Sequence, residues 1–451
     1  MLKQLIKNAK IVSDLQIIEG DLLISNGIIE EIAPQISADA TMQVIDANGA
    51  YLIPGVIDDQ VHFREPGLTH KANIYTESRA ALAGGTTSFM EMPNVNPQTV
   101  TNELLELKYE LGAASSAVNY SFYLGGTNDN LEEVKKVNPR NVCGVKIFMG
   151  SSTGNMLVDQ EEALNGLFAN SPILIATHCE SESRVKSRYA DALAQYGDDI
   201  PANQHPIIRD AEACYLSSSF AMELAKKHNS RLHILHITSE KETYLFRNDI
   251  PLKDKRITAE VCVHHLHYSD ADYSTLGHLI KCNPAIKTQN DREALWSALL
   301  DDRFDVIATD HAPHTWEEKQ NLYPNAPSGL PLVQHALSLM MDYVAKGKIT
   351  IEKMVEKMCH NPAILYQIEN RGYVREGYAA DLVLLKQNPN VNIQTQEFTV
   401  NKWNLLYKCA WSPMEGHTFS YAPSKVWVNG TLSYSDGLIG ELNPQRLLFN
   451  R

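Results

Sequence analysis

The sequence predicts an α/β fold in which eight parallel strands close into a (β/α)8 barrel, with a small β domain beside it. Eight short apolar runs of strand character are separated, in most cases, by segments with helical periodicity. Strands that alternate with helices predict a parallel sheet. At 451 residues the chain has room for one such barrel, which takes about 250 residues, and for a smaller second domain.

The predicted strands lie at residues 51–57, 86–90, 117–123, 142–148, 173–177, 232–237, 257–263 and 306–309. The helical segments between them have recognisable ends. One segment, 77–83, stops at Gly84-Gly85, and another, 210–228, begins at a capping Asp210 and ends in three basic residues. The same pattern also fits an open doubly wound sheet, which remains the alternative at this point.

The two ends of the chain are expected to form the β domain together. Asn26-Gly27 separates two apolar runs near the start, and Asn429-Gly430 separates two others near the end. Asn-Gly between apolar runs is a strong hairpin signal. Because chain ends often lie close together, the two hairpins predict one shared β domain.

Composition limits the classes of partner. Hydrophobic residues make up 44% and charged residues 21% of the chain, as in ordinary soluble proteins. The net charge of −14 argues against a general nucleic-acid or anionic-membrane binder, because both need a basic surface. The seven cysteines are scattered, and no run reaches the roughly 18 apolar residues of a membrane span. We therefore expect a cytoplasmic protein that acts on a small molecule.

Several potential metal ligands fall near the carboxyl ends of predicted strands. They are His62, Lys146, His178, His236 and Asp310. In an α/β barrel chemistry collects at that edge, so residues far apart in sequence would meet there. Taken singly, each histidine could equally be a hydrogen-bonded interior residue. Their shared position at strand ends favours an open-sided zinc site that leaves a place for water.

Lys146 and Asp310 have chemical reasons to belong to such a site. Lys146 lies inside an apolar strand, where an ammonium is costly unless it is paired, chemically changed or reaches past the strand end to solvent. Asp310 heads the run Asp310-His311-Ala312-Pro313-His314. A carboxylate at this position can hold a metal and exchange a proton with the bound water.

Arg64 is the candidate for substrate binding, because its planar guanidinium pairs with a carboxylate through two hydrogen bonds. It lies two residues after His62. Asn94 and Asn283, which are expected to follow the second and seventh strands, are either substrate ligands or simple turn residues. The arrangement predicts hydrolysis of a substrate that carries its own carboxylate.

The segment His62-Phe63-Arg64-Glu65-Pro66-Gly67 resembles the opening motif of cyclic amidohydrolases, and most closely the dihydroorotase pattern His-x-His-x-Arg-Glu-Pro-Gly. Further likeness extends over the metal-ligand runs and the C-terminal segments 361–363, 377–384 and 408–416, so it covers essentially the whole chain. The resemblance implies reversible hydrolysis of (S)-dihydroorotate to N-carbamoyl-L-aspartate in de novo pyrimidine (UMP) biosynthesis. It also implies a metal-bound hydroxide as nucleophile and Asp310 as proton shuttle.

The resemblance further assigns domains and site residues. It implies a barrel over residues 53–385 and a β-sandwich from residues 1–52 and 386–451. It implies one or two Zn²⁺ per chain, a carboxylated Lys146 that bridges two metals, His236 in preference to His233, and a homodimer. The implied metal ligands are His62, Lys146, His178, His236 and Asp310, and the implied substrate ligands are Arg64, Asn94, Asn283, His314, Ser328 and Gly329.

Gln60 departs from the pattern, because it stands where these enzymes have their first metal-binding histidine. A neutral amide oxygen is a weaker zinc ligand, so the metal shared by His62 and Asp310 is expected to be held less tightly, unless Asp58 or Asp59 reaches inward. Two alternatives therefore stay open. One is a hydantoinase or allantoinase, which typically lacks an arginine at the Arg64 position, and the other is a catalytically silent homologue that acts as a scaffold.

Overall fold

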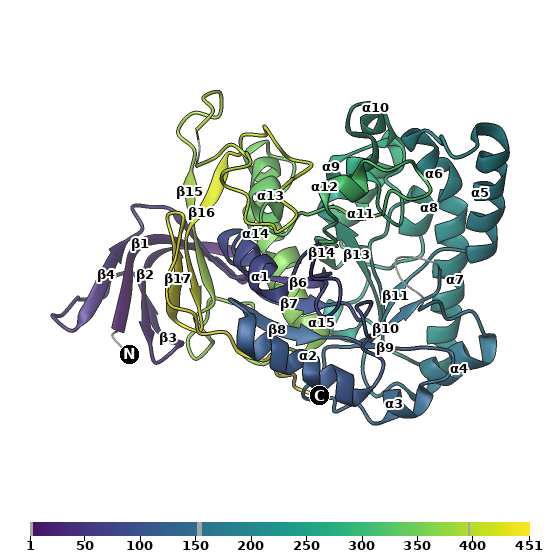
Figure 1. Cartoon of the computed structure of the whole chain (residues 1–451). Helices are drawn as coiled ribbons and strands as arrows, with labels where there is room; N and C mark the ends of the chain where they lie inside the picture. The colour runs from purple at the N-terminus through teal and green to yellow at the C-terminus, as the bar shows by residue number, and fades with distance from the viewer. Residues whose placement is uncertain (1–2, 151–155, 396) are drawn as a thin grey trace.

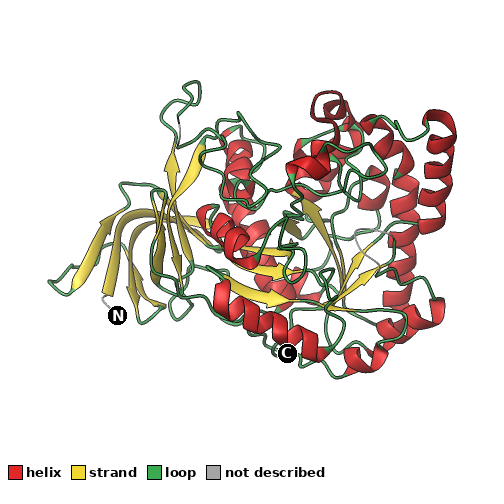
Figure 2. Ribbon diagram, in the orientation of Figure 1, coloured by secondary structure: helices red, strands yellow, loops and turns green. Residues whose placement is uncertain are grey.

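The computed structural model describes residues 3–150, 156–395 and 397–451. Figure 1 shows two regions: strands from both ends of the chain on the left, and the central part of the chain on the right. In the right-hand region helices lie outside a set of parallel strands (Figure 2). The structure is therefore mixed α/β, as predicted.

The parallel strands lie in the central part of the chain. They are β6 (Val56–Val61), β7 (Thr86–Glu91), β8 (Asn119–Phe122), β9 (Leu124–Gly125), β10 (Val145–Phe148), β11 (Ile175–His178), β12 (Leu232–Ile234), β13 (Ile257–Cys262) and β14 (Val306–Ala308). They pair in the orders β6-β7-β8 and β9-β10-β11-β12-β13-β14. Beyond β14, the His62 N–H donates to the His311 carbonyl at 2.7 Å, which links the first and last strands of the series.

Helices follow most of these strands. They are α1 (Ile74–Ala83), α2 (Asn102–Ser115), α3 (Leu131–Lys135), α4 (Glu161–Asn170), α5 (Glu182–Tyr196), α6 (His205–Ile208), α7 (Ala211–His228), α8 (Glu240–Thr243), α9 (Val263–His267), α10 (Tyr273–Leu276), α11 (Gln289–Leu300), α12 (Trp316–Lys319), α13 (Ala336–Ala345), α14 (Ile351–Val355) and α15 (Asn361–Tyr366). Further helical segments are the 3-10 turns η1 (Ala202–Gln204), η2 (Leu252–Asp254), η3 (Asp270–Asp272) and η4 (Gly277–Ile280) and the π-helical η5 (Glu356–His360).

The predicted helix ends are confirmed at two helices. Asp210 caps α7, since its side chain accepts a hydrogen bond from the Ala213 N–H at 3.0 Å. Gly84 ends α1. Both residues satisfy backbone groups that a helix terminus leaves without an intrahelical partner.

Strands from both chain ends share one nine-stranded sheet. Its members are β1 (Lys3–Ser13), β2 (Gln16–Ser25), β3 (Ile28–Ala33), β4 (Met42–Asp46), β5 (Tyr51–Pro54), β15 (Leu382–Gln387), β16 (Tyr421–Val428), β17 (Thr431–Ser435) and β18 (Leu438–Ile439). β5 pairs antiparallel with β15, and this pairing joins the N-terminal and C-terminal strands. The hairpin turns at Asn26-Gly27 and Asn429-Gly430 have positive φ at both residues, so both predicted hairpins are confirmed.

One predicted strand is wrong in its extent. The run 51–57 is two strands, β5 and β6, which belong to different sheets and meet at Gly55. The Gly55 N–H donates to the Asp381 carbonyl at 2.8 Å, and a Cβ at this position would lie 2.0 Å from Thr87 Oγ1. The backbone crosses between the sheets at a point where only glycine fits. Because both strands are largely buried, apolar periodicity does not reveal the break.

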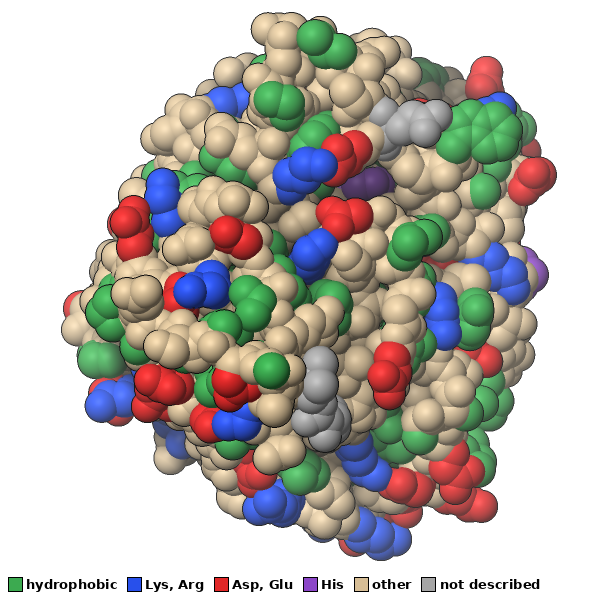
Figure 3. All heavy atoms as spheres, turned by 90° about the vertical axis from the view of Figure 1, so that its left-hand side faces the viewer, with side chains coloured by type: hydrophobic (Ala, Val, Ile, Leu, Met, Phe, Trp, Pro, Cys, Tyr) green, Lys and Arg blue, Asp and Glu red, His purple; other side chains and the backbone are tan. Residues whose placement is uncertain are grey.

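Charged side chains of both signs are mixed on one face of the molecule (Figure 3), and the cysteines lie inside it. On the face of the molecule in Figure 3, Lys and Arg side chains are interspersed with Asp and Glu. Every cysteine is buried and has a free thiol. Among the described residues, no helix is both long enough and apolar enough to span a bilayer.

Candidate metal and substrate site

The five predicted metal ligands lie at or near the carboxyl ends of the parallel strands, and all are buried. Two close pairs form between residues that are far apart in sequence. His62 Nε2 lies 3.1 Å from Asp310 Oδ1, and His178 Nδ1 lies 3.1 Å from His236 Nε2. Lys146 lies on β10, which comes after β6 and directly before β11 in the chain. It interacts electrostatically with Asp310 and with all three histidines.

The backbone leaves strand geometry where two of these residues occur. His236 has φ 41° and Asp310 has φ 46°, both in the left-handed region that residues other than glycine seldom adopt. Strict alternation would place His233 and His236 on opposite faces of a strand. β12 ends at Ile234, so this rule no longer applies at His236, which contacts His178 instead. Backbone of this kind is typical of functional sites.

In each pair, one imidazole has a second polar contact. This contact is made by the ring nitrogen that does not face the other member of the pair. His62 Nδ1 lies 2.8 Å from Asn94 Oδ1, and His178 Nε2 lies 3.0 Å from Glu180 Oε2. Arg209 pairs with Glu180 in turn. Metal-binding histidines are held in this way, with the other nitrogen directed at the ion. Two ligands of a tetrahedral zinc lie about 3.4 Å apart, so the spacing of His178 and His236 fits a shared ion.

The protonation states also fit a metal site. Burial lowers the pKa of His62 to about 4, although the adjacent Asp310 carboxylate acts in the opposite direction. Burial likewise lowers the pKa of the Lys146 ammonium to about 8. Imidazole binds metals in its neutral form, and a lysine with a lowered pKa is partly a free amine near neutral pH.

Gln60 lies inside this site. Its Nε2 donates to Asp310 Oδ1 at 3.1 Å, so the amide binds the carboxylate in the region where the resemblance expects a ligand imidazole. The two neighbouring carboxylates face other residues. Asp58 Oδ2 accepts a 2.6 Å hydrogen bond from Thr309 Oγ1, and Asp59 Oδ2 lies 3.3 Å from His233 Nε2.

Two cationic side chains, Arg64 and Lys71, contact His314 beside the predicted metal ligands. Arg64 Nη2 lies 3.1 Å from His314 Nε2, and Lys71 Nζ lies 3.0 Å from His314 Nδ1. These residues and Asn94 line a cavity of about 660 Å³. Lys71 also pairs with Glu318 at 3.1 Å, so Arg64 is the cation of this group that best suits an anionic ligand. Lys71 was not predictable from the sequence, because no motif distinguishes it from other surface lysines.

The loop that contains Ser328 and Gly329 closes one side of this group of residues. The Ser328 carbonyl lies 3.0 Å from His314 Nε2, and the Gly329 N–H donates to the Lys281 carbonyl at 2.8 Å. Gly329 has φ 137°, and a Cβ there would lie 2.4 Å from the Ala312 carbonyl oxygen. Only glycine therefore fits this position without strain.

Asn283 does not directly follow a strand, which corrects the sequence expectation. β13 ends at Cys262, and α9, α10 and η4 intervene before Asn283. The apolar run of β13 ends at helix α9, and the sequence does not show how far the chain continues before it returns to the site. Among the described residues, Asn283 Oδ1 is buried and has no hydrogen-bond partner. Its neighbour Lys281 contacts the Gly329 loop.

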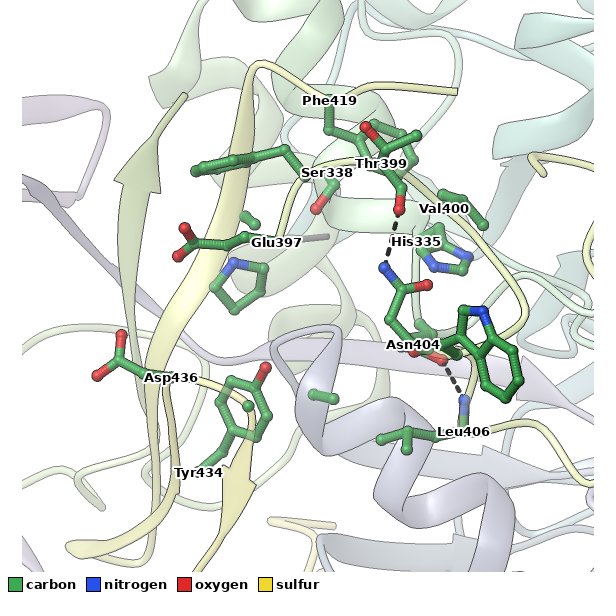
Figure 4. A pocket seen from close by; sticks show the side chains of 17 residues that line it. His335, Ser338, Glu397, Thr399, Val400, Asn404, Leu406, Phe419, Tyr434 and Asp436 are labelled. Carbon is green, nitrogen blue, oxygen red and sulfur yellow. Dashed lines mark hydrogen bonds between the residues drawn. The ribbon is translucent and has the colours of Figure 1, made fainter. Parts of the chain in front are cut away.

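A second cavity, of about 590 Å³, lies between α13 and the strands β16 and β17 (Figure 4). Its labelled lining includes Ser338, Thr399 and Tyr434, and the Asn404 amide donates to the Thr399 carbonyl at 2.8 Å. None of the predicted site residues lines it. The cavity beside Arg64 is therefore the one that matches the predicted chemistry.

The chain belongs to the amidohydrolase family, whose model matches residues 51–432. It is 31% identical over 402 residues to the dihydroorotase of Halobacterium salinarum, with 87% of this chain and 90% of that protein covered. It is 31% identical over 443 residues to the dihydroorotase of Enterococcus faecalis, with 96% and 99% covered.

Among solved structures, the L-hydantoinase of Arthrobacter aurescens superposes with a TM-score of 0.91 at 24% identity and covers 99% of this chain and all of that one. At this identity the likeness shows a shared fold. Together with the family match and the named relatives, it identifies an enzyme of the cyclic amidohydrolases, in the group that contains dihydroorotases and hydantoinases.

Proposed function

We propose that the protein is a zinc-dependent dihydroorotase, which reversibly hydrolyses the ring amide of (S)-dihydroorotate to N-carbamoyl-L-aspartate in de novo pyrimidine biosynthesis. The observation that carries the proposal is the buried Arg64, 3.1 Å from His314, beside the pair His62 and Asp310. Dihydroorotate carries a carboxylate for this guanidinium, whereas hydantoin and allantoin do not. The curated relatives, which are dihydroorotases, support the same choice.

The proposal includes the domain architecture. The parallel strands form a closed (β/α)8 barrel within residues 53–385, in which β8 and β9 are two parts of one interrupted strand. The terminal segments 1–52 and 386–451 form a β-sandwich. The hydrogen bond from His62 to His311 supports closure of the barrel. A contact between the two terminal segments supports a shared terminal domain: Trp427 Nε1 donates to Gln4 Oε1 at 2.9 Å.

One zinc would be held by Lys146, His178 and His236, and a second would be held by Lys146, His62 and Asp310. When bound, zinc lowers the pKa of a coordinated water towards neutrality and polarises the amide carbonyl. As a carbamate, Lys146 would offer carboxylate-type oxygen ligands, which its ammonium form lacks. Its neutral amine adds to carbon dioxide with loss of one proton, and the lowered pKa of Lys146 supports this step.

The side chains position the substrate and move the proton. Arg64 and His314 bind the substrate carboxylate, and Asn94, Asn283 and the backbone of Ser328-Gly329 bind the ring. Asp310 accepts a proton from the attacking water and delivers it to the leaving ring nitrogen. One water molecule is consumed: its oxygen joins the amide carbon, the ring C–N bond breaks, and the nitrogen gains a proton.

The test is a comparison of dihydroorotate, hydantoin and allantoin as substrates of the zinc-loaded protein. The proposal expects dihydroorotate to have the highest kcat/KM, by about a hundredfold or more, from the charge-assisted pair with Arg64. Faster turnover of hydantoin or allantoin assigns the protein to that branch. No turnover of any of them, with zinc present at His178 and His236, supports the silent homologue that Gln60 motivates.

A further inference from the structure

A second group of potential metal ligands lies one layer deeper along the same strands. Asp59 on β6, His233 on β12 and Glu260 on β13 each have 0% exposure. One ligand atom from each residue lies within 4.8 Å of the others. Asp59 and His233 each precede a proposed catalytic ligand, His62 and His236, by three residues. The deeper group shares no residue with the proposed catalytic site.

The polar atoms of this group that face one another have no hydrogen-bond partner. Among the described residues, these atoms are both carboxylate oxygens of Asp59, His233 Nε2 and Glu260 Oε2. The other polar atoms of two of these side chains are engaged. His233 Nδ1 lies 2.8 Å from Thr258 Oγ1, and Glu260 Oε1 accepts a 3.0 Å hydrogen bond from the His236 N–H. These contacts leave His233 Nε2 and Glu260 Oε2 directed towards Asp59.

This arrangement is costly without a cation. Two carboxylates away from water need compensating charge, and an imidazolium between them balances only one. His233 Nε2 lies 3.3 Å from Asp59 Oδ2 and 3.7 Å from Glu260 Oε2, at ion-pair distance but without a well-formed hydrogen bond. A divalent cation with a neutral His233 balances both carboxylates.

We propose that Asp59, His233 and Glu260 bind a divalent metal ion, best fitted by zinc, beneath the catalytic site. One imidazole nitrogen and two carboxylate oxygens suit zinc, and ligands about 3.4 Å apart are those of a tetrahedral ion. The ion holds Glu260 in place, and Glu260 in turn holds the backbone of His236. Asp59 directly precedes Gln60, so the chain carries an additional buried carboxylate beside the position that lacks the imidazole.

The decisive experiment is a crystal structure of the zinc-equilibrated full-length protein, with anomalous data on both sides of the zinc absorption edge. A peak within about 2.3 Å of Asp59, His233 Nε2 and Glu260 is expected. Zinc density near His178 and His236 but none among these three residues would overturn the proposal. Dihydroorotate turnover is measured separately. A negative result for the deeper site therefore does not count against the proposed function, and the reverse also holds.

Variants give a second readout by elemental analysis after removal of loosely bound metal. Asp59→Asn, with Glu260→Gln as a second variant if the first does not fold, is expected to lose one zinc per chain and to retain zinc at His178 and His236. The matched control, His178→Asn, is expected to lose a catalytic zinc and to retain the deeper ion. An unchanged zinc content in both deep-site variants, or a His233 that keeps two N–H protons in the zinc-equilibrated protein, contradicts the proposal.

Discussion

The Gln60 amide and the His62 imidazole meet the same oxygen of Asp310, each at 3.1 Å. The same Asp310 oxygen therefore contacts an imidazole, which is a good zinc ligand, and an amide, which is a poor one. The amide N–H group also competes with a metal for the Asp310 lone pairs. We therefore expect the ion shared by His62 and Asp310 to be the weaker of the two proposed catalytic ions.

Gln60 is expected to weaken one of the two proposed catalytic zinc positions. In the wild-type protein, anomalous occupancy is expected to be full between His178 and His236 and partial between His62 and Asp310. Gln60→His replaces the competing donor by an imidazole and is expected to raise the affinity of the weaker position about tenfold or more, roughly 1.4 kcal/mol. Zinc titration against a chelator measures the change.

Gln60→Met is the control, because it removes the hydrogen bond to Asp310 and supplies no imidazole. Equal zinc affinity of Gln60→His and wild type would show that the missing ligand does not belong at position 60. Full occupancy of both catalytic positions in the wild type would contradict the expected weakness of the second ion.

Arg64→Met is expected to lower kcat/KM for dihydroorotate by about a hundredfold, since a charge-assisted pair is worth roughly 2–3 kcal/mol. Arg64→Lys retains the charge but not the bidentate hydrogen-bonding geometry. Its kcat/KM is expected to lie between those of Arg64→Met and wild type. Any residual hydrolysis of hydantoin is the internal control, because hydantoin has no carboxylate. An equal loss on both substrates, with an unchanged melting temperature, would mean that Arg64 does not bind the carboxylate.

Asp310→Asn is expected to lower kcat by about 10²–10⁴-fold, because the amide cannot accept and return a proton. Zinc at His178 and His236 should remain, as measured by elemental analysis with anomalous scattering. The matched control is Asp198→Asn at an exposed position. If Asp310→Asn kept more than about a tenth of the wild-type rate, the proton would travel by another group.

The pH dependence of stability is expected to include a contribution from Glu180. Burial would raise its pKa, but Arg209 and His178 outweigh burial and hold the pKa at about 2, below the usual 4.5. A lowered carboxyl pKa stabilises the folded protein above pH 4.5, and this stability is lost as the pH falls towards 2. The expected loss is on the order of 3 kcal/mol.

Denaturant unfolding of metal-free wild type and Glu180→Gln over this pH range measures the contribution of Glu180. The wild type should lose more of its free energy of unfolding than the variant does, since glutamine does not titrate. Parallel pH profiles for the two proteins would rule out the ion pair between Glu180 and Arg209 as the source of the pH dependence of stability.

Gly329→Ala is expected to raise the KM for dihydroorotate and to destabilise the protein by more than about 2 kcal/mol, because the added Cβ meets the Ala312 carbonyl and the backbone is left-handed. Gly49→Ala is the matched control. Gly49 also has a positive φ, but nothing lies within 4 Å of its Cβ position, so a loss of about 1 kcal/mol is expected. Equal decreases in melting temperature for the two variants would show that the close approach to Ala312 is unimportant.

Local patterns were sufficient for most of the elements. The hairpins at Asn26-Gly27 and Asn429-Gly430 and the cap at Asp210 were predictable because turn and cap preferences depend on a few neighbouring residues. The break at Gly55 was not predictable. It depends on the approach of Thr87, which lies 32 positions later in the chain (87 − 55).

The residues of the candidate site also differ in whether the sequence alone reveals them. His62, Lys146, His178, His236 and Asp310 could be proposed from their places at strand ends and from family likeness. The roles of Lys71, beside His314, and of Asp59, beside His233 and Glu260, could not. No local pattern distinguishes a lysine or an aspartate that faces a cavity or the strand interior from one that faces solvent.

The chain by itself therefore determined the element types, the family and the chemical nature of the ligands, because these depend on short-range preferences and residue identity. Tertiary structure alone decided which side chains meet: Gln60 with Asp310, Arg64 with His314, and Asp59 with His233. Such contacts join strands and loops that lie far apart along the chain, so they depend on how the parallel strands are arranged and not on any one segment.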